Sequence, residues 1–122
     1  MNNILLVGFG AGLGGILRYL VANSVQRLFP MSLPIGTLSV NFLGSFLLGL
    51  LIFGLSDNGV LSSNWRLFLA IGFCGGFTTF STFSFETFAL LQDAEFFLAT
   101  LNIFLNLFTT ILAVAFAYII TR

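Results

Sequence analysis

The sequence is short of charge. Its 122 residues include four basic and four acidic side chains, 7% of the total, whereas 58% are hydrophobic. Soluble domains carry about 25% charged residues, because their surfaces face water. So few charges cannot cover a soluble domain of this length, and we expect the chain to lie in a lipid bilayer. The net charge is zero, which argues against a nucleic-acid partner because nothing would neutralise its phosphates.

Histidine and lysine are absent, and there is one cysteine, Cys74. One cysteine forms no internal disulfide, and without histidine it provides no common zinc site within one chain. Histidine-based acid–base catalysis is likewise excluded. Because no nucleophile stands beside a positioned base, an enzyme is the least favoured class.

Apolar runs long enough to span a bilayer, about 20 residues each, occur four times. They cover residues 4–25, 35–55, 65–91 and 96–120, within a single domain over residues 1–122. Pro30 and Pro34 interrupt the first connection, and residues 62–64 are typical of a helix N-cap. The predicted fold is therefore an all-α membrane protein with four transmembrane helices.

An even number of spans places both termini on one side of the membrane, together with the connection between the second and third spans. Arg66 and Arg122 lie on that side, and Arg27 lies on the other. Basic residues in loops bias the orientation of a membrane protein. A bias of one residue is compatible with a single orientation or with insertion both ways up.

The third span contains Gly75-Gly76 followed by Thr78 and Thr79. Glycine costs up to about 1 kcal/mol in a helix relative to alanine, and threonine is stiff at χ1. The pattern predicts a helix broken near its middle, and the alternative is an intact helix with small residues for close packing. A broken helix frees carbonyls and amides that can bind ions.

Hydroxyl and phenylalanine side chains alternate after this glycine pair. The hydroxyls are Thr78, Thr79, Ser81, Thr82, Ser84 and Thr87, and Phe80 and Phe83 share a helix face. The hydroxyls either bond back to the preceding turn of the helix or form a polar track. The rings either pack against lipid and protein or turn their positive edges towards an anion.

Other polar residues fall inside the predicted spans. Asn41 and Asn106 are candidates for the same track, whereas for Asn102 we favour hydrogen bonding between helices. Glu86 and Arg18 are functional candidates because intramembrane charges are costly. Each could instead pair with the other or with a carbonyl.

The first span contains the pattern G-x-G-x-x-G from Gly10 to Gly15. A dinucleotide site is rejected, because no βαβ unit fits the chain and no acidic residue follows at about 20 residues. The pairs Gly8/Gly12, Gly10/Gly14 and Gly72/Gly76 instead have the G-x-x-x-G spacing that brings membrane helices close together. This much small-residue surface suggests an oligomer.

Several of these segments resemble the Fluc/CrcB fluoride channels. They are Leu17-Arg18-Tyr19 at the end of the first span, Pro34-Ile35-Gly36-Thr37-Leu38, Val40-Asn41, and above all the run from Gly72 to Ser84. The resemblance extends over essentially the whole chain. It implies a fluoride-selective passive channel that exports fluoride from the cytoplasm across the bacterial plasma (inner) membrane. It also implies an antiparallel, dual-topology homodimer with two pores.

The resemblance implies a role for each matching residue. The ion pathway would contain Asn41, Phe80, Phe83, Ser81, Thr82, Ser84, Glu86, Asn106 and Thr110, and the vestibule would contain Arg18 and Thr37. Backbone carbonyls of Gly75 and Thr78 would bind a structural sodium ion shared by the two subunits.

Two other functions compete with the channel. A small proton-coupled multidrug exporter also has four spans, but its carboxylate is expected in the first span, where this chain has none. A membrane assembly subunit without transport activity would use its glycines and amides for packing. That role leaves the hydroxyl-aromatic run unexplained.

Overall fold

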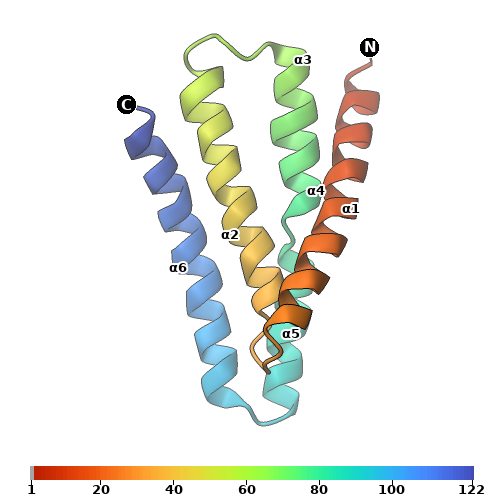
Figure 1. Ribbon diagram of the computed structural model, residues 1–122, viewed down its shortest axis with the longest axis vertical. Helices are drawn as coiled ribbons and strands as arrows, with labels where there is room; N and C mark the ends of the chain where they lie inside the picture. Colours follow the sequence, from red (N-terminus) through yellow and green to blue (C-terminus); the bar gives the residue numbers. More distant parts are fainter. Residues whose placement is uncertain (1) are drawn as a thin grey trace.

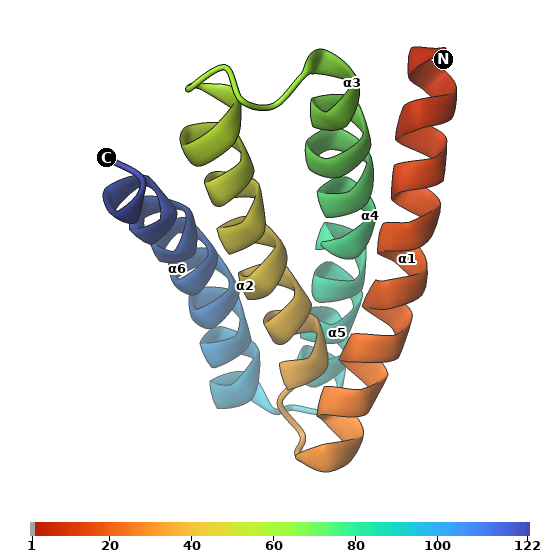
Figure 2. The same cartoon turned by 45° about the horizontal axis from the view of Figure 1, so that its top comes forward.

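The computed structural model describes residues 2–122, and every long segment in this range is helical (Figures 1 and 2). The first segment is α1 (Asn3–Leu28), and the second consists of α2 (Ile35–Gly49) and the π-helical η1 (Leu50–Ser56). The third consists of α3 (Ser63–Trp65), the π-helical η2 (Arg66–Cys74), α4 (Gly75–Phe77) and α5 (Phe80–Gln92). The last is α6 (Phe96–Ile120).

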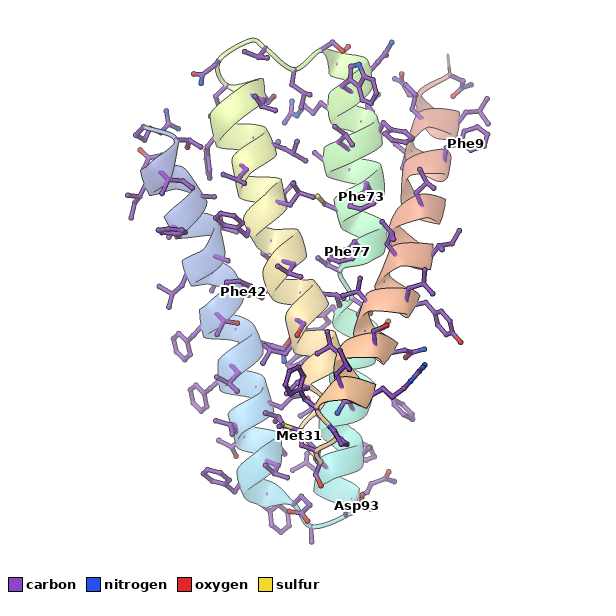
Figure 3. All side chains as sticks on the ribbon, in the orientation of Figure 1. Phe9, Met31, Phe42, Phe73, Phe77 and Asp93 are labelled. Atoms are coloured by element: carbon purple, nitrogen blue, oxygen red, sulfur yellow. The ribbon has the colours of Figure 1, made fainter. Side chains whose placement is uncertain are left out.

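Four segments are long and apolar enough to cross a membrane, as the sequence predicted: Asn3–Leu28, Ile35–Ser56, Ser63–Gln92 and Phe96–Ile120. No strand occurs within residues 2–122. Both termini and the η1–α3 connection lie at one end of the bundle (Figure 1). Met31 and Asp93, in the other two connections, lie at the opposite end (Figure 3).

Side chains satisfy the backbone groups where helices begin. The Ser62 hydroxyl accepts a hydrogen bond from the Trp65 N–H at 3.4 Å, which confirms the N-cap predicted before the third span. Gln26 shapes the first connection. Its Nε2 donates to the carbonyls of Met31 and Leu33, each at 3.1 Å, and its Oε1 accepts from the Gly36 N–H at 2.9 Å.

Glycines bring α1 against η2 and α4. A Cβ added to Gly10 or Gly14 would overlap the carbonyl oxygen of Phe68 or Phe73, and one added to Gly76 would overlap that of Ala11. Two of the predicted G-x-x-x-G pairs, Gly10/Gly14 and Gly72/Gly76, therefore pack inside one chain. Since they are used there, they do not by themselves indicate an oligomer.

The helical path is interrupted after Phe77, where Thr78 (φ −91°, ψ 159°) and Thr79 (φ −151°, ψ 120°) have extended backbone. The sequence predicts the break from Gly75-Gly76 together with Thr78 and Thr79; the two threonines are the extended residues, whereas both glycines are helical. Gly76 faces α1, and its missing side chain serves close packing.

Helices α2 and α6 form a second tight pair. The Gly49 position lies against the Ala117 methyl group, and the rings of Phe46 and Phe116 stack with centroids 5.8 Å apart. Most large apolar side chains face outwards. Figure 3 shows Phe9 pointing away from the bundle, whereas Phe73 and Phe77 lie between helices. Outward apolar surface of this kind suits contact with lipid or with another membrane chain.

We predict that Gly14→Ala lowers the free energy of unfolding by about 1–3 kcal/mol, because the added methyl group forces α1 away from η2. Gly12→Ala is the matched control on the same helix, since nothing lies within 4 Å of its added Cβ. It should leave stability unchanged or raise it by up to about 1 kcal/mol. Thermal unfolding in detergent, followed by circular dichroism, measures both. Equal stability of the two variants would contradict the close contact.

Candidate functional site

A polar stripe runs along α2. Thr37, Asn41 and Ser45 follow one another at intervals of four residues, so they share one face of the helix. Thr37 and Asn41 are buried, and Ser45 is half-buried. Since buried polar groups need partners, this face marks where polar side chains of other helices meet.

Asn41 pairs with the peptide backbone at the interruption between α4 and α5. Its Oδ1 accepts from the Thr79 N–H at 2.8 Å, and its Nδ2 donates to the Thr79 carbonyl at 3.1 Å. In an unbroken helix the Thr79 N–H would instead bond to the Gly75 carbonyl. Asn41 therefore satisfies a backbone segment that would otherwise be unpaired at membrane depth, where unpaired groups are costly.

Two hollows meet at this pair. A cavity of about 230 Å³ is lined by Arg18, Tyr19, Ala22, Asn23, Gln26, Gly36, Thr37, Val40, Thr79, Thr82 and Glu86. A second hollow of about 190 Å³ is lined by Asn41, Ser45, Thr78, Thr79, Phe80 and Thr110. Because Thr79 lines both, the Asn41–Thr79 pair lies at the boundary between them.

Arg18 brings a positive charge to the first cavity. Its Nε donates to the Gly76 carbonyl at 3.1 Å, so the guanidinium also caps the carboxyl end of α4, where a cation is favoured. Arg18 thus pairs with a carbonyl, one of the alternatives that the sequence left open. Among residues 2–122, the one ion pair joins Arg122 to Asp57, at 3.6 Å.

Glu86 lies between the first cavity and a more open hollow of about 280 Å³ towards the α5–α6 turn. Ser32 and Asp93 also line this outer hollow. The Glu86 Oε1 atom is buried and has no hydrogen-bond partner among the described residues. One oxygen of the carboxyl group is therefore without a partner, whereas Thr37 lies within hydrogen-bonding reach of the same group.

The aromatic pair lies beside the second hollow. The ring centroids of Phe80 and Phe83 are 5.4 Å apart, with their planes inclined at 55°. Phe83 is buried, but Phe80 is 73% exposed. Both rings line a groove of about 380 Å³ on the outer face of α5 and α6, together with Ser84, Thr87, Phe88, Leu91, Ile103 and Leu107. The groove is apolar apart from the two hydroxyls and is open on one side.

The hydroxyl groups divide into two kinds. Ser84 and Thr87 bond back to the carbonyls of the preceding turn, at 3.0 and 2.8 Å. Thr79 instead caps α5, because its Oγ1 accepts from the Thr82 N–H at 3.2 Å and donates to the Thr82 Oγ1 at 3.1 Å. The Thr82 hydroxyl oxygen thus accepts this hydrogen bond, and the Thr82 hydroxyl proton is available to a partner inside the first cavity. Ser81 is exposed, with its Oγ 3.5 Å from the Thr79 Oγ1.

The remaining predicted residues lie close to the interruption. Asn106 is buried and donates to the Asn102 carbonyl at 2.9 Å, while its Oδ1 accepts from Asn41 at 3.0 Å. Asn106 therefore holds the Asn41 side chain by a hydrogen bond and does not itself line either hollow. Thr110 lines the second hollow with Thr78, and Gly75 is exposed one turn earlier.

Polar residues that the sequence did not single out also line the hollows, among them Ser45, Asn23 and Gln26. Ser45 could have been found from its spacing, since it lies two helical turns beyond Thr37 and one beyond Asn41. Thr79 was predicted through its hydroxyl, but its backbone pairing with Asn41 had no signal, because that pairing depends on extended backbone and on a partner from another helix.

Known proteins are similar to this chain along almost its entire length. The sequence model of the family described as "CrcB-like protein, Camphor Resistance (CrcB)" matches residues 5–118. A Campylobacter jejuni protein named "Fluoride-specific ion channel FluC" is 46% identical over 122 residues, which cover 100% of this chain and 99% of the relative. Proteins of the same name from Methanococcus maripaludis and Pyrococcus horikoshii are 50% and 48% identical. Those alignments cover 88% and 98% of this chain, and 86% and 95% of the relatives.

Proposed function

Because this chain belongs to the CrcB family, we propose that it is a fluoride-selective channel through which fluoride leaves the cytoplasm passively. The names of its relatives are those of ion channels, so the chain is not an enzyme. It is an integral multi-pass membrane protein with four helices of spanning length, and we place it in the bacterial plasma (inner) membrane.

One observation carries the proposal. At the interruption after Phe77, the polar stripe of α2 meets the hydroxyls of α5 and the ring of Phe80. Fluoride is a small hydrogen-bond acceptor, so hydroxyl and amide donors can replace its water. Conduction also requires weak binding at each step, and the edges of Phe80 and Phe83 are weakly positive. Arg18 raises the local concentration of anions at the first cavity.

We infer that a second copy of the chain completes the pathway. The groove that Phe80 and Phe83 line is open along one side in a single chain, and Phe80 is mostly exposed. An identical chain related by a twofold axis would cover this surface and contribute the same one in return. Two symmetric pathways would result. The weak charge bias of the loops suits an antiparallel pair, inserted both ways up.

We further propose that a sodium ion binds between the two chains of the dimer. The Gly75 carbonyl loses its helical partner because the Thr79 N–H donates to Asn41. The Thr78 carbonyl belongs to a residue outside either helix. Carbonyl oxygens of this kind can take the place of a cation's water. Gly75 is exposed, and nothing lies within 4 Å of a Cβ added there, so carbonyls from two chains could meet at one ion.

Fluoride release from liposomes tests the channel. Purified protein in vesicles loaded with potassium fluoride should release fluoride rapidly when valinomycin is added, as read by a fluoride electrode. Vesicles loaded with potassium chloride should release little chloride under the same conditions. Protein-free vesicles give the background leak. Folded, dimeric protein that releases no fluoride above this leak would contradict the proposal.

Phe80→Ile and Phe83→Ile test the aromatic pathway. Each removes a ring edge while leaving an apolar side chain, so fluoride efflux should fall by about tenfold or more, the factor that corresponds to about 1.4 kcal/mol. Phe97→Ile is the control, because Phe97 is exposed and lines none of the hollows. Dimer content is measured by gel filtration in detergent. Wild-type efflux in both pathway variants would remove the rings from the pathway.

Preparation without sodium tests the cation site. Protein extracted, purified and reconstituted with a bulky organic cation in place of sodium should form fewer dimers or conduct less fluoride. Returning sodium should restore both, because only a small cation fits between backbone carbonyls. Identical dimer content and efflux in the two preparations would count against a structural sodium ion.

A further inference from the structure

We propose that Asn102, which lines none of the hollows, is a positioning residue for ion conduction. It acts through Asn106 on Asn41, and its orientation is fixed by Thr87. The link to conduction rests on the proposed channel function. The structural part of the proposal is a buried chain of hydrogen bonds that joins α2, α5 and α6 at the interruption.

The chain of hydrogen bonds has four links beyond the Asn41–Thr79 pair. Asn41 Nδ2 donates to Asn106 Oδ1 at 3.0 Å, and Asn106 Nδ2 donates to Asn102 Oδ1 at 3.1 Å. Asn102 Nδ2 donates to Thr87 Oγ1 at 2.9 Å. The Thr87 hydroxyl then donates to the Phe83 carbonyl at 2.8 Å. The chain therefore starts at the backbone of Thr79 and returns to α5 at the backbone of Phe83.

The hydrogen bond to the Phe83 carbonyl determines which group donates and which accepts in every other hydrogen bond of the series. A carbonyl only accepts, so Thr87 must give it its single proton and can only accept from Asn102. Asn102 then has to present its oxygen to Asn106. Asn106 in turn has to present its oxygen to Asn41, whose oxygen is left for the Thr79 N–H. Reversing one amide would set donor against donor or acceptor against acceptor.

Burial makes these orientations costly to change. Asn102 is 1% exposed and Asn106 is 5% exposed, and Asn41 and Thr87 are each 8% exposed. Asn102 and Asn106 line none of the described hollows, so water does not replace a lost partner there, and unpaired polar groups are penalised more strongly in a medium of low dielectric constant. The sequence analysis favoured helix contact for Asn102, and the structure gives that contact a directed role at the site.

The hydrogen-bond chain ends, on both sides, at residues of the proposed pathway. Thr79 caps α5 immediately before Phe80, and the Phe83 carbonyl belongs to the second aromatic residue. The first turn of α5, which carries both rings, is thus tied to α2 through Asn41 and to α6 through Asn102. Loss of a middle link should loosen the rings and Asn41 together.

Two substitutions interrupt the series of hydrogen bonds in different ways. Thr87→Val keeps the side-chain shape but leaves the Asn102 amide without an acceptor. Asn102→Leu removes the amide and leaves Asn106 with the backbone carbonyl of residue 102 as its remaining acceptor. Thr87→Ser keeps the hydroxyl and with it the acceptor for the Asn102 amide. Thr100→Val is the matched control, because the exposed Thr100 hydroxyl makes the same kind of bond, to the Phe96 carbonyl at 2.9 Å.

Fluoride efflux and the NMR signals of the asparagine side chains are measured on each variant in its dimeric form. We expect Thr87→Val and Asn102→Leu to lower efflux by about tenfold and to shift the side-chain amide signals of Asn41. Thr100→Val should change neither, and Thr87→Ser should keep the Asn41 signals of the wild type. Unchanged Asn41 signals in Thr87→Val would show that the hydrogen bonds do not connect Thr87 to Asn41, and would overturn the structural part of the proposal. Wild-type efflux in Thr87→Val, despite shifted signals, would overturn its role in conduction.

The two proposals fail separately. If the wild-type protein releases no fluoride, the channel function fails, while the NMR comparison still decides whether Asn102 and Thr87 orient Asn41. If the wild type conducts and Asn102→Leu does not fold, Thr87→Val decides the question, since it removes one hydroxyl and keeps the shape of the side chain.

Discussion

The pairing of the Asn41 amide with the backbone of Thr79 is the interaction on which the rest of the site depends. Extended backbone at membrane depth persists only where it is buried in protein or lines a water-filled cavity, because unpaired backbone groups are costly in lipid. Asn41 supplies both an acceptor and a donor from one side chain, at 2.8 and 3.1 Å. The interruption in turn sets where α5 begins, and with it the positions of Phe80 and Phe83.

The bundle divides its packing between two kinds of contact. On the α1 side, glycines let backbones meet directly, as where Gly14 lies against the Phe73 carbonyl. On the α6 side, contact with α2 and α5 is partly polar and runs through buried amides such as Asn102 and Asn106. The glycine contacts fix how closely the helices approach. The amide contacts fix register, because each hydrogen bond between helices joins one particular pair of residues.

Much of the candidate site could be predicted because its residues are chemically unusual in a membrane span. Arg18, Asn41 and Glu86 stand out against an apolar background, and the structure places all three at the hollows around the interruption. Ser45 was missed although its spacing from Asn41 signalled it. Gly75-Gly76 and Thr78-Thr79 together predicted the break, but only the threonines leave the helix, because Gly76 packs against Ala11 of α1 and stays helical.

The sequence by itself determined the number of helices long enough to span a membrane, their approximate ends and which polar residues lie within them. These follow from hydrophobic length and from the cost of polar groups in lipid, which are properties of local composition. Only the tertiary structure decided that Thr78 and Thr79 leave the helix, that Arg18 caps Gly76, and that Asn102 reaches Asn41 through Asn106. Each of these depends on a hydrogen-bond partner far away in the sequence, and no local pattern specifies which partner a polar group will find.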